Sequence, residues 1–200
     1  MSKLDPTTTA LLLVDLQNDC LHPKGAYGRA GLMVDQIAQL PSRLRPLADA
    51  LRKREGWVVA THFTILEGKH GKPLLPEHLQ KLRPFLVQGD FKPGSWGHRM
   101  VDELGEADLH VDKVSFSAFY MTPLEWILRQ TKVDTILLSG VTSPVSIAAT
   151  LRDALQRDFR TIVLEDGCGA YEAKLHRSAI SEMASTAPIK TCADALECLR

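Results

Sequence analysis

LLSGVTSPVSIAATLRDA, residues Leu137 to Ala154, is the stretch that decides the fold class. It overlaps the apolar run Thr135 to Ser139 (TILLS), which is typical of a buried strand. A tight turn follows Gly140, and apolar residues then recur at helical spacing from Ser146 to Gln156. A strand, a turn and a helix in this order, repeated along a chain, indicate an α/β protein with parallel strands.

The same alternation recurs on both sides of this stretch. Short apolar blocks that indicate further strands are Ala10 to Asp15, Trp57 to Thr61, Leu109 to Val114 and Thr161 to Leu164. Segments with helical spacing are Asp35 to Arg54, Pro123 to Gln130 and Ala173 to Ser185. We therefore predict a single domain over residues 1–200, with a three-layer, doubly wound, mostly parallel sheet and helices on both faces.

The segment His62 to Met100 breaks this alternation, since glycine and proline punctuate it throughout. Long irregular insertions inside a compact domain usually bind ligands or cover a site. We expect this segment to be a binding or lid segment.

Composition limits the partners and the compartment. The formal net charge is zero, with 24 basic and 24 acidic residues, so no electrostatic footprint for nucleic acid or an anionic membrane exists. The apolar runs are far shorter than a bilayer span. Four cysteines without CxxC spacing favour free thiols in a reducing compartment. We expect a soluble, cytoplasmic protein with a small-molecule partner.

Three polar residues follow or end predicted strands, where ligands bind in such sheets. Asp15 comes after four apolar residues, which favours a base of raised pKa, although a helix cap is the alternative. Lys113 has apolar neighbours and indicates a carboxylate partner, unless it is an edge-strand lysine that reaches water. Ser146 begins a helix whose backbone N–H groups could face an oxyanion, or it merely caps that helix.

Together the motifs resemble a family. The order VDLQND, VDKxxxSAF and LSGVTSxVxIxxTLRDA is similar to the isochorismatase-like (cysteine hydrolase) superfamily, and the likeness extends from Ala10 to about Ala170. The resemblance implies that Asp15 is the general base and Lys113 its charged partner. Ser146 would stand at the nucleophile position, which most members fill with cysteine.

The resemblance also implies details of the site. The Val141–Thr142 bond would be a cis peptide, with the backbone N–H groups of Thr142 and Ser146 as the oxyanion hole. The substrate pocket would be lined by Gln17, Trp96, Phe116, Phe119 and Tyr120. Family members usually self-associate, so a homo-oligomer is expected.

Two departures from the family pattern concern chemistry. The nicotinamidase branch has a metal site after its second strand, but here the stretch is THFTILEGKH, with Phe63 and Ile65 where ligands would be needed. We therefore predict no metal. Neither GxGxxG nor a P-loop occurs, so no organic cofactor is expected.

The second departure is the serine at position 146. Its hydroxyl is far less acidic than the usual thiol, so its activation needs a stronger base arrangement.

Three functions stay open on the sequence. The motif NDxxHPxGAYGRAG, Asn18 to Gly31, resembles the ureido- and carbamoyl-amide hydrolases, so we predict C–N bond cleavage in a small linear amide, ureide or carbamoyl compound. Ser146 would then be a natural variant or an introduced replacement of cysteine. The alternatives are a vinyl-ether hydrolase of the isochorismatase type, with Asp15 as the acid, and a catalytically silent binding homologue.

Overall fold

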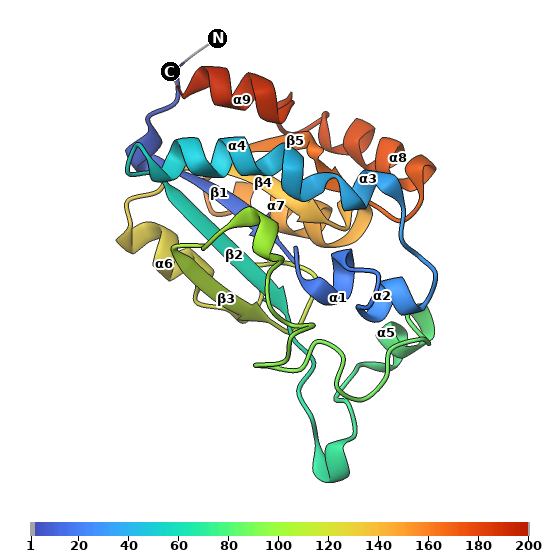
Figure 1. Cartoon of the computed structure of the whole chain (residues 1–200). Coiled ribbons are helices and arrows are strands. Elements are labelled where there is room, and N and C mark those ends of the chain that lie inside the picture. The colour runs from blue at the N-terminus through green and yellow to red at the C-terminus, as the bar shows by residue number, and fades with distance from the viewer. Residues whose placement is uncertain (1–2, 200) are drawn as a thin grey trace.

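A six-stranded parallel sheet forms the centre of the computed structural model, which describes residues 3–199 (Figure 1). The strand order is β3-β2-β1-β4-β5-β6, and every neighbouring pair is parallel. The strands are β1 (Thr9–Val14), β2 (Trp57–Phe63), β3 (Leu109–Lys113), β4 (Thr135–Val141), β5 (Arg160–Gly169) and β6 (Ile189–Lys190). The predicted parallel α/β sheet is confirmed.

The continuous apolar run of β1 is explained by its central position. Leu11 and Leu13 pack into one hydrophobic core, whereas Ala10, Leu12 and Val14 pack into the other. Because both faces of the strand are covered, neither needs polar residues, and all six positions are buried.

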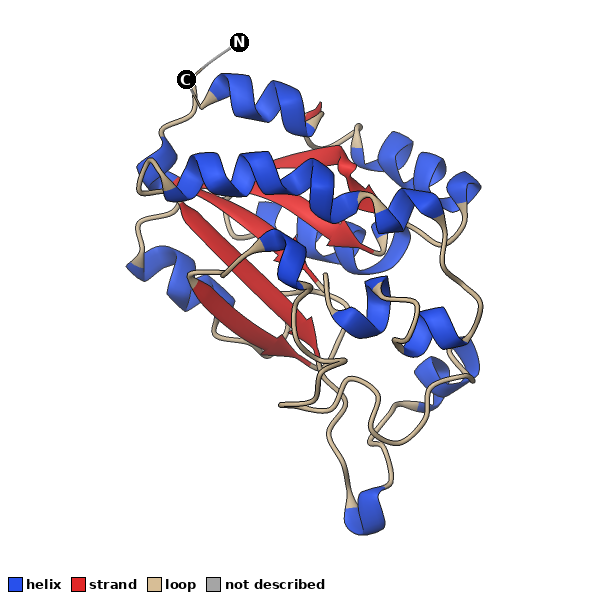
Figure 2. Cartoon of the chain, viewed as in Figure 1, coloured by secondary structure: helices blue, strands red, loops and turns tan. Residues whose placement is uncertain are grey.

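Helices cover both faces of the sheet, as Figure 2 shows. One layer consists of α3 (Asp35–Ala38), α4 (Leu40–Arg52) and α9 (Cys192–Cys198). The opposite layer consists of α6 (Leu124–Gln130), α7 (Ala148–Leu155) and α8 (Ala173–Met183). The three-layer arrangement matches the prediction. No helix within residues 3–199 is both long and apolar enough to cross a membrane.

Two parts of the predicted element order need correction. The single helix predicted from Asp35 to Arg54 is divided at Gln39 into α3 and α4, and Pro41, which lacks an N–H donor, lies in the first turn of α4, where no helical bond needs it. The strand β6 and the helix α9 were not predicted. β6 has only two residues, but α9 has a recognisable start, the capping box formed by Thr191 and Asp194.

Residues 64–100, called the lid segment below, leave β2 at its carboxyl end. In place of long helices they contain η2 (Lys69–Gly71) and α5 (Glu77–Leu82). The part around η2 projects away from the body of the molecule (Figure 1). A backbone bridge between Gln17 and Met100 ties the end of the segment back to the chain after β1. The other short helical pieces are η1 (Pro6–Thr8), α1 (Asn18–Leu21), α2 (Ala26–Arg29) and η3 (Asp102–Leu104).

Candidate active site

The site lies where the strand order reverses. From β1 the chain adds β2 and β3 on one side, and β4 then pairs with the other side of β1. In such sheets a crevice forms at the carboxyl ends of the two strands that flank this switch point. Asp15 follows β1 directly, and Ser146 lies in η4 (Ser143–Ile147), the π-helical turn between β4 and α7.

Gly140 allows β1 and β4 to approach each other at this point. It has φ +123°, and a Cβ placed on it would lie 2.0 Å from the carbonyl oxygen of Val14. Only glycine accepts both the backbone conformation and the contact. The Val141–Thr142 peptide bond that follows is cis, and the chain then enters η4.

Asp15 is the centre of the polar network. Its Oδ2 lies 2.7 Å from Nζ of Lys113 and accepts a hydrogen bond from Oγ of Ser146 at 3.3 Å. Oδ1 accepts from Oγ1 of Thr61, also at 3.3 Å. Asp15 has φ +57°, a conformation that aspartate adopts more readily than most residues. The predicted base, Asp15, therefore contacts both its cationic partner, Lys113, and the nucleophile position, Ser146.

Lys113 is fully enclosed, so it is not an edge-strand lysine that reaches water. None of its side chain is exposed. Beyond Asp15, its ammonium donates to the carbonyl oxygens of Ser115 at 2.9 Å and Phe116 at 3.1 Å. These three acceptors use all three donors of the ammonium group. The bonds fix the charge in place and leave it compensated by Asp15.

Burial and hydrogen bonding act on Asp15 in opposite directions. Loss of water raises the pKa of this carboxyl, while Lys113, Ser146 and Thr61 favour its charged form and lower it. The desolvation effect is the larger, so the pKa of Asp15 stays above its ordinary value. A carboxyl with a raised pKa is a stronger base in its charged form, which suits a group that must accept a proton and return it.

Asp15 and Ser146 open into a narrow cavity of about 50 Å³. Thr142 lines it beside Ser146, and Phe116 lines it from the loop after β3. Aromatic and apolar side chains form most of the remaining wall: Tyr27, Phe63, Leu79, Leu82, Phe91, Val141, Val145 and Tyr171.

A family model, described as the isochorismatase domain, matches residues 9–194. The chain belongs to the isochorismatase family. Among curated relatives of this family, the ureidoacrylate amidohydrolase RutB of Methylobacterium radiotolerans is 32% identical over 195 residues, covering 90% of this chain and 74% of the relative.

Solved structures of other proteins share the fold. A cysteine hydrolase from Pseudomonas syringae pv. phaseolicola superposes with a TM-score of 0.85 at 22% identity, covering 100% of this chain and 95% of the other. N-carbamoylsarcosine amidase from Thermoplasma acidophilum superposes with a TM-score of 0.72 at 24% identity, covering 92% and 96% of the two chains. This isochorismatase-family chain thus has the fold of both.

Gln17, which the family resemblance placed in the substrate pocket, has a different position. It is fully buried beside the sheet end and does not line the cavity. Its amide nitrogen donates to the carbonyl oxygens of Phe63 at 3.0 Å and His98 at 2.9 Å, and its amide oxygen accepts from the Phe63 N–H at 2.8 Å. Gln17 therefore holds the lid segment against the end of β2.

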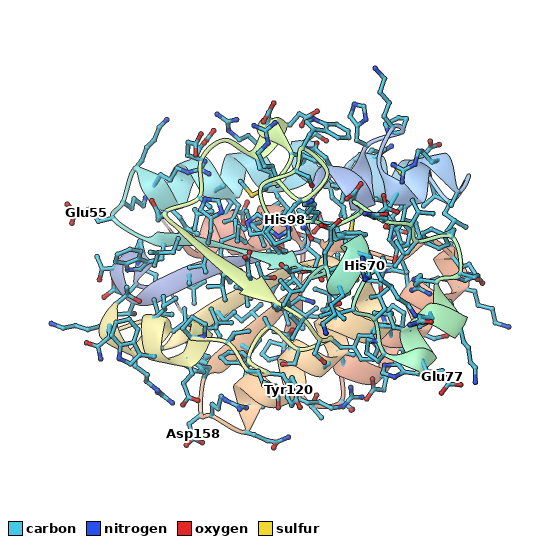
Figure 3. The ribbon with its side chains drawn as sticks, turned by 90° about the horizontal axis from the view of Figure 1, so that it is seen from below. Glu55, His70, Glu77, His98, Tyr120 and Asp158 are labelled. Carbon is cyan, nitrogen blue, oxygen red and sulfur yellow. The ribbon has the colours of Figure 1, made fainter. Side chains whose placement is uncertain are left out.

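Three predicted aromatic residues also lie outside the cavity. Trp96 is half-exposed and packs edge-on against His22, with 4.8 Å between ring centroids. Phe119 belongs to the core on the opposite face of the sheet and stacks on Phe159. Tyr120 is exposed and lies at the rim of the molecule in Figure 3. Of the five predicted pocket residues, Phe116 alone lines the cavity.

Other cavity residues escaped prediction. Tyr171 follows the carboxyl end of β5, so the rule that ligands bind at these ends could have identified it. Tyr27 lies within the quoted GAYGRAG motif, but its side-chain direction depends on α2. Arg83 comes from the lid segment, where no sequence pattern indicates which residues face inward. Within residues 3–199, no group of three or more His, Cys, Asp and Glu side chains is arranged to hold a metal ion.

Proposed function

We propose that this protein is an amidohydrolase that cleaves the C–N bond of a small linear amide, ureide or carbamoyl compound. The observation that carries the proposal is the double contact of Asp15 Oδ2, with Lys113 Nζ at 2.7 Å and Ser146 Oγ at 3.3 Å. A curated relative named as a ureidoacrylate amidohydrolase and a similar structure named as an N-carbamoylsarcosine amidase support this class of substrate.

The proposed reaction begins at Ser146. Asp15 accepts the hydroxyl proton while Oγ attacks the carbonyl carbon, and the backbone N–H groups of Thr142 and Ser146 stabilise the oxyanion. The C–N bond then breaks as Asp15 returns the proton to the leaving nitrogen, which departs as ammonia or an amine. Water, deprotonated by Asp15, hydrolyses the covalent ester and frees Ser146. Lys113 keeps Asp15 available in its charged form.

Serine makes the first step slower than cysteine would. A thiol has a pKa of about 8.5, whereas a serine hydroxyl is far less acidic and stays protonated in the resting site. We expect Ser146→Cys to raise turnover by orders of magnitude on the right substrate, and Ser146→Ala to abolish it.

One observation favours a second candidate, the vinyl-ether hydrolase. That reaction needs a protonated Asp15 to act as an acid, and burial raises the pKa of Asp15 toward this state. Ser146 would then not be a nucleophile, and Ser146→Ala would retain activity.

The two reactions predict opposite pH profiles. The test measures release of ammonia from a panel of ureides, carbamoyl amino acids and maleamate-type amides, and consumption of isochorismate, across pH with the unsubstituted chain and both Ser146 variants. An amidohydrolase gains activity as pH rises through the pKa of Asp15, because the base must be charged. A vinyl-ether hydrolase loses activity over the same range. Saturable binding without turnover, in the unsubstituted chain and in Ser146→Cys, would contradict both reactions and support the binding homologue.

A further inference from the structure

Arg83 supplies a positive charge that the proposed reaction does not use. Among the described residues that line the cavity, it is the only cationic side chain. At the inner end of the cavity, Asp15 and Lys113 compensate each other at 2.7 Å. Arg83 is half-buried, and a neutral substrate that covers it would leave its charge without a counterion beside aromatic side chains, which is unfavourable.

The hydrogen bonds of Arg83 all go to neutral acceptors. Its Nε donates to the hydroxyl of Tyr27 at 2.7 Å, and its Nη1 donates to the carbonyl oxygen of Leu82 at 3.1 Å. Burial raises the pKa of Tyr27 to about 12, so this phenol is uncharged at neutral pH. Within residues 3–199, no carboxylate lies within ion-pair distance of Arg83, whereas Arg29 pairs with Asp90 at 2.5 Å.

The guanidinium group is held in a fixed position. Tyr27 stacks on Tyr171 with 4.3 Å between ring centroids and 9° between planes, and it packs edge-on against Phe85. The carbon of the guanidinium group lies 5.7 Å from the centroid of the Tyr27 ring. A guanidinium group anchored through Nε and Nη1 retains the two N–H donors of Nη2 for another acceptor. A carboxylate suits these donors, because a hydrogen bond between two charged groups is shorter and stronger than one between neutral groups.

We propose that Arg83 binds a carboxylate of the substrate, which makes the preferred substrate an anionic ureido or carbamoyl acid. The carboxylate lies at the end of the molecule opposite the bond that is cleaved. The inference rests on the proposed amidohydrolase function and adds the charge of its substrate. It also gives the lid segment a role, because Arg83 follows α5 directly and brings the specificity-determining charge to a cavity whose reacting groups come from the sheet.

The test compares two probes of the same length. 3-Ureidopropionate carries a carboxylate where propylurea carries a methyl group, and both offer the same ureide to Ser146. We measure kcat/KM for ammonia release and the affinity of each probe by calorimetry. A charged hydrogen-bonded pair of this kind corresponds to a preference of roughly tenfold or more for the anionic probe. Arg83→Gln should remove the preference mainly by raising KM for 3-ureidopropionate, and Arg83→Lys should keep part of it.

Lys81→Gln is the matched control. Lys81 lies two residues earlier on α5, with 75% of its side chain exposed and its ammonium 2.6 Å from Glu77. The substitution removes a positive charge from the same segment, but Lys81 does not line the cavity. The ratio of the two kcat/KM values should stay unchanged in this variant. Tyr27→Phe removes the acceptor of Nε and should lower the ratio only partly, since Tyr27 positions Arg83 and does not itself carry the charge.

The outcomes separate the two proposals. If both probes are hydrolysed at similar kcat/KM and Arg83→Gln lowers both equally, the carboxylate site is wrong and the amidohydrolase function stands. If 3-ureidopropionate binds in an Arg83-dependent way but neither probe releases ammonia, even with Ser146→Cys, the carboxylate site stands and the amidohydrolase function is wrong. If neither probe binds nor reacts, both proposals are overturned.

Discussion

The switch point between β1 and β4 and the lid segment lie at the same edge of the sheet but are built differently. At the switch point, Asp15 is 4% exposed and backbone atoms of neighbouring strands approach to contact distance. In the lid segment, large apolar side chains remain in water, with Leu66 49% and Leu74 60% exposed. The reacting groups thus come from the carboxyl ends of β1 and β3 and from the turn η4 after β4, and the contact proposed for specificity comes from a loop. Substrate preference can change in this arrangement without disturbing the catalytic geometry.

Replacement of Asp15 is expected to have the largest effect. Asp15→Asn keeps the shape of the residue but removes the proton acceptor, so turnover should fall by roughly 10²- to 10⁴-fold. The measurement is kcat on the substrate identified in the ureide panel. Glu67→Gln, which changes a lid carboxylate in the same way, should leave kcat near its original value. An active Asp15→Asn protein would show that the switch point does not carry the chemistry.

Alanine substitutions at two glycines of positive φ test how the packing of the switch point differs from that of the lid segment. Gly140→Ala forces a Cβ to within 2.0 Å of the Val14 carbonyl oxygen and should lower the free energy of unfolding by more than about 4 kcal/mol. Gly94 in the lid segment has φ +79° but no atom within 4 Å of such a Cβ. Gly94→Ala should cost only about 1–2 kcal/mol of backbone strain. Urea unfolding measures both, and similar losses would mean that the two regions do not differ in packing.

Two lysine–carboxylate pairs give a second comparison. Lys113→Ala leaves Asp15 buried without its cation, and we expect a loss of about 3–5 kcal/mol in stability together with a further rise in the pKa of Asp15. In the lid segment, the half-exposed Lys92 pairs with Glu67 at 2.8 Å. Lys92→Ala should lower the free energy of unfolding by at most about 1 kcal/mol. Urea unfolding and an NMR titration of Asp15 provide the data.

A double-mutant cycle then tests whether Asp15 and Lys113 act as one unit. The turnover of the Asp15→Asn, Lys113→Ala protein should be little worse than that of the more impaired single variant, because residues that act together are strongly non-additive. The cycle is measured in the Ser146→Cys background. Additive losses with an unshifted Asp15 titration would mean that the pair does not share a catalytic role.

The protein should become less stable in acid because of a histidine at the end of β2, where the lid segment begins. His62 on β2 donates through Nδ1 to the His98 carbonyl oxygen at 3.0 Å, and its Nε2 lies 2.9 Å from Nδ1 of His110. Burial lowers the pKa of His62 to about 4, so the folded protein binds this proton less readily than the unfolded chain does. Stability should therefore fall as pH falls from about 6.5 to about 4, by at most roughly 3 kcal/mol.

His62→Gln should flatten this part of the stability profile, measured by urea unfolding at pH 7 and pH 4.5. His70, an exposed residue of η2 that Figure 3 labels, is the control position. His70→Gln should leave the profile as it is. An unsubstituted chain equally stable at both pH values would show that His62 does not weaken the sheet end in acid.

The sequence predicted the parts of the molecule that depend on local pattern. β1 and β4 were predictable because a central strand with both faces covered leaves an unbroken apolar run. The rule that the carboxyl ends of parallel strands meet at one edge placed Asp15, Lys113 and Ser146 there, but their roles were implied only by the resemblance to the isochorismatase-like superfamily. The capping box of α9 was present in the sequence, but β6 is too short to leave a pattern.

The cavity wall was harder to predict because it depends on tertiary packing. Phe116 and Phe119 lie three residues apart in one loop, yet one lines the cavity and the other packs on the far face of the sheet. Nothing in the local sequence decides which way each ring turns. Arg83 reaches the cavity only because the lid segment docks over it, and that docking depends on contacts such as those of Gln17 with Phe63 and His98.

The hydrogen bond between Asp15 and Ser146 joins positions 131 residues apart in the chain. During synthesis β1 emerges early, whereas β4, its neighbour on one side, is made only after the lid segment and β3. Until then the most apolar strand of the molecule lacks a neighbour along one edge, and unpaired edges of this kind promote aggregation. Closing so long a loop is also slow in parallel sheets. The active site therefore cannot form until synthesis has passed β4 and reached Ser146, which brings the two reacting groups side by side.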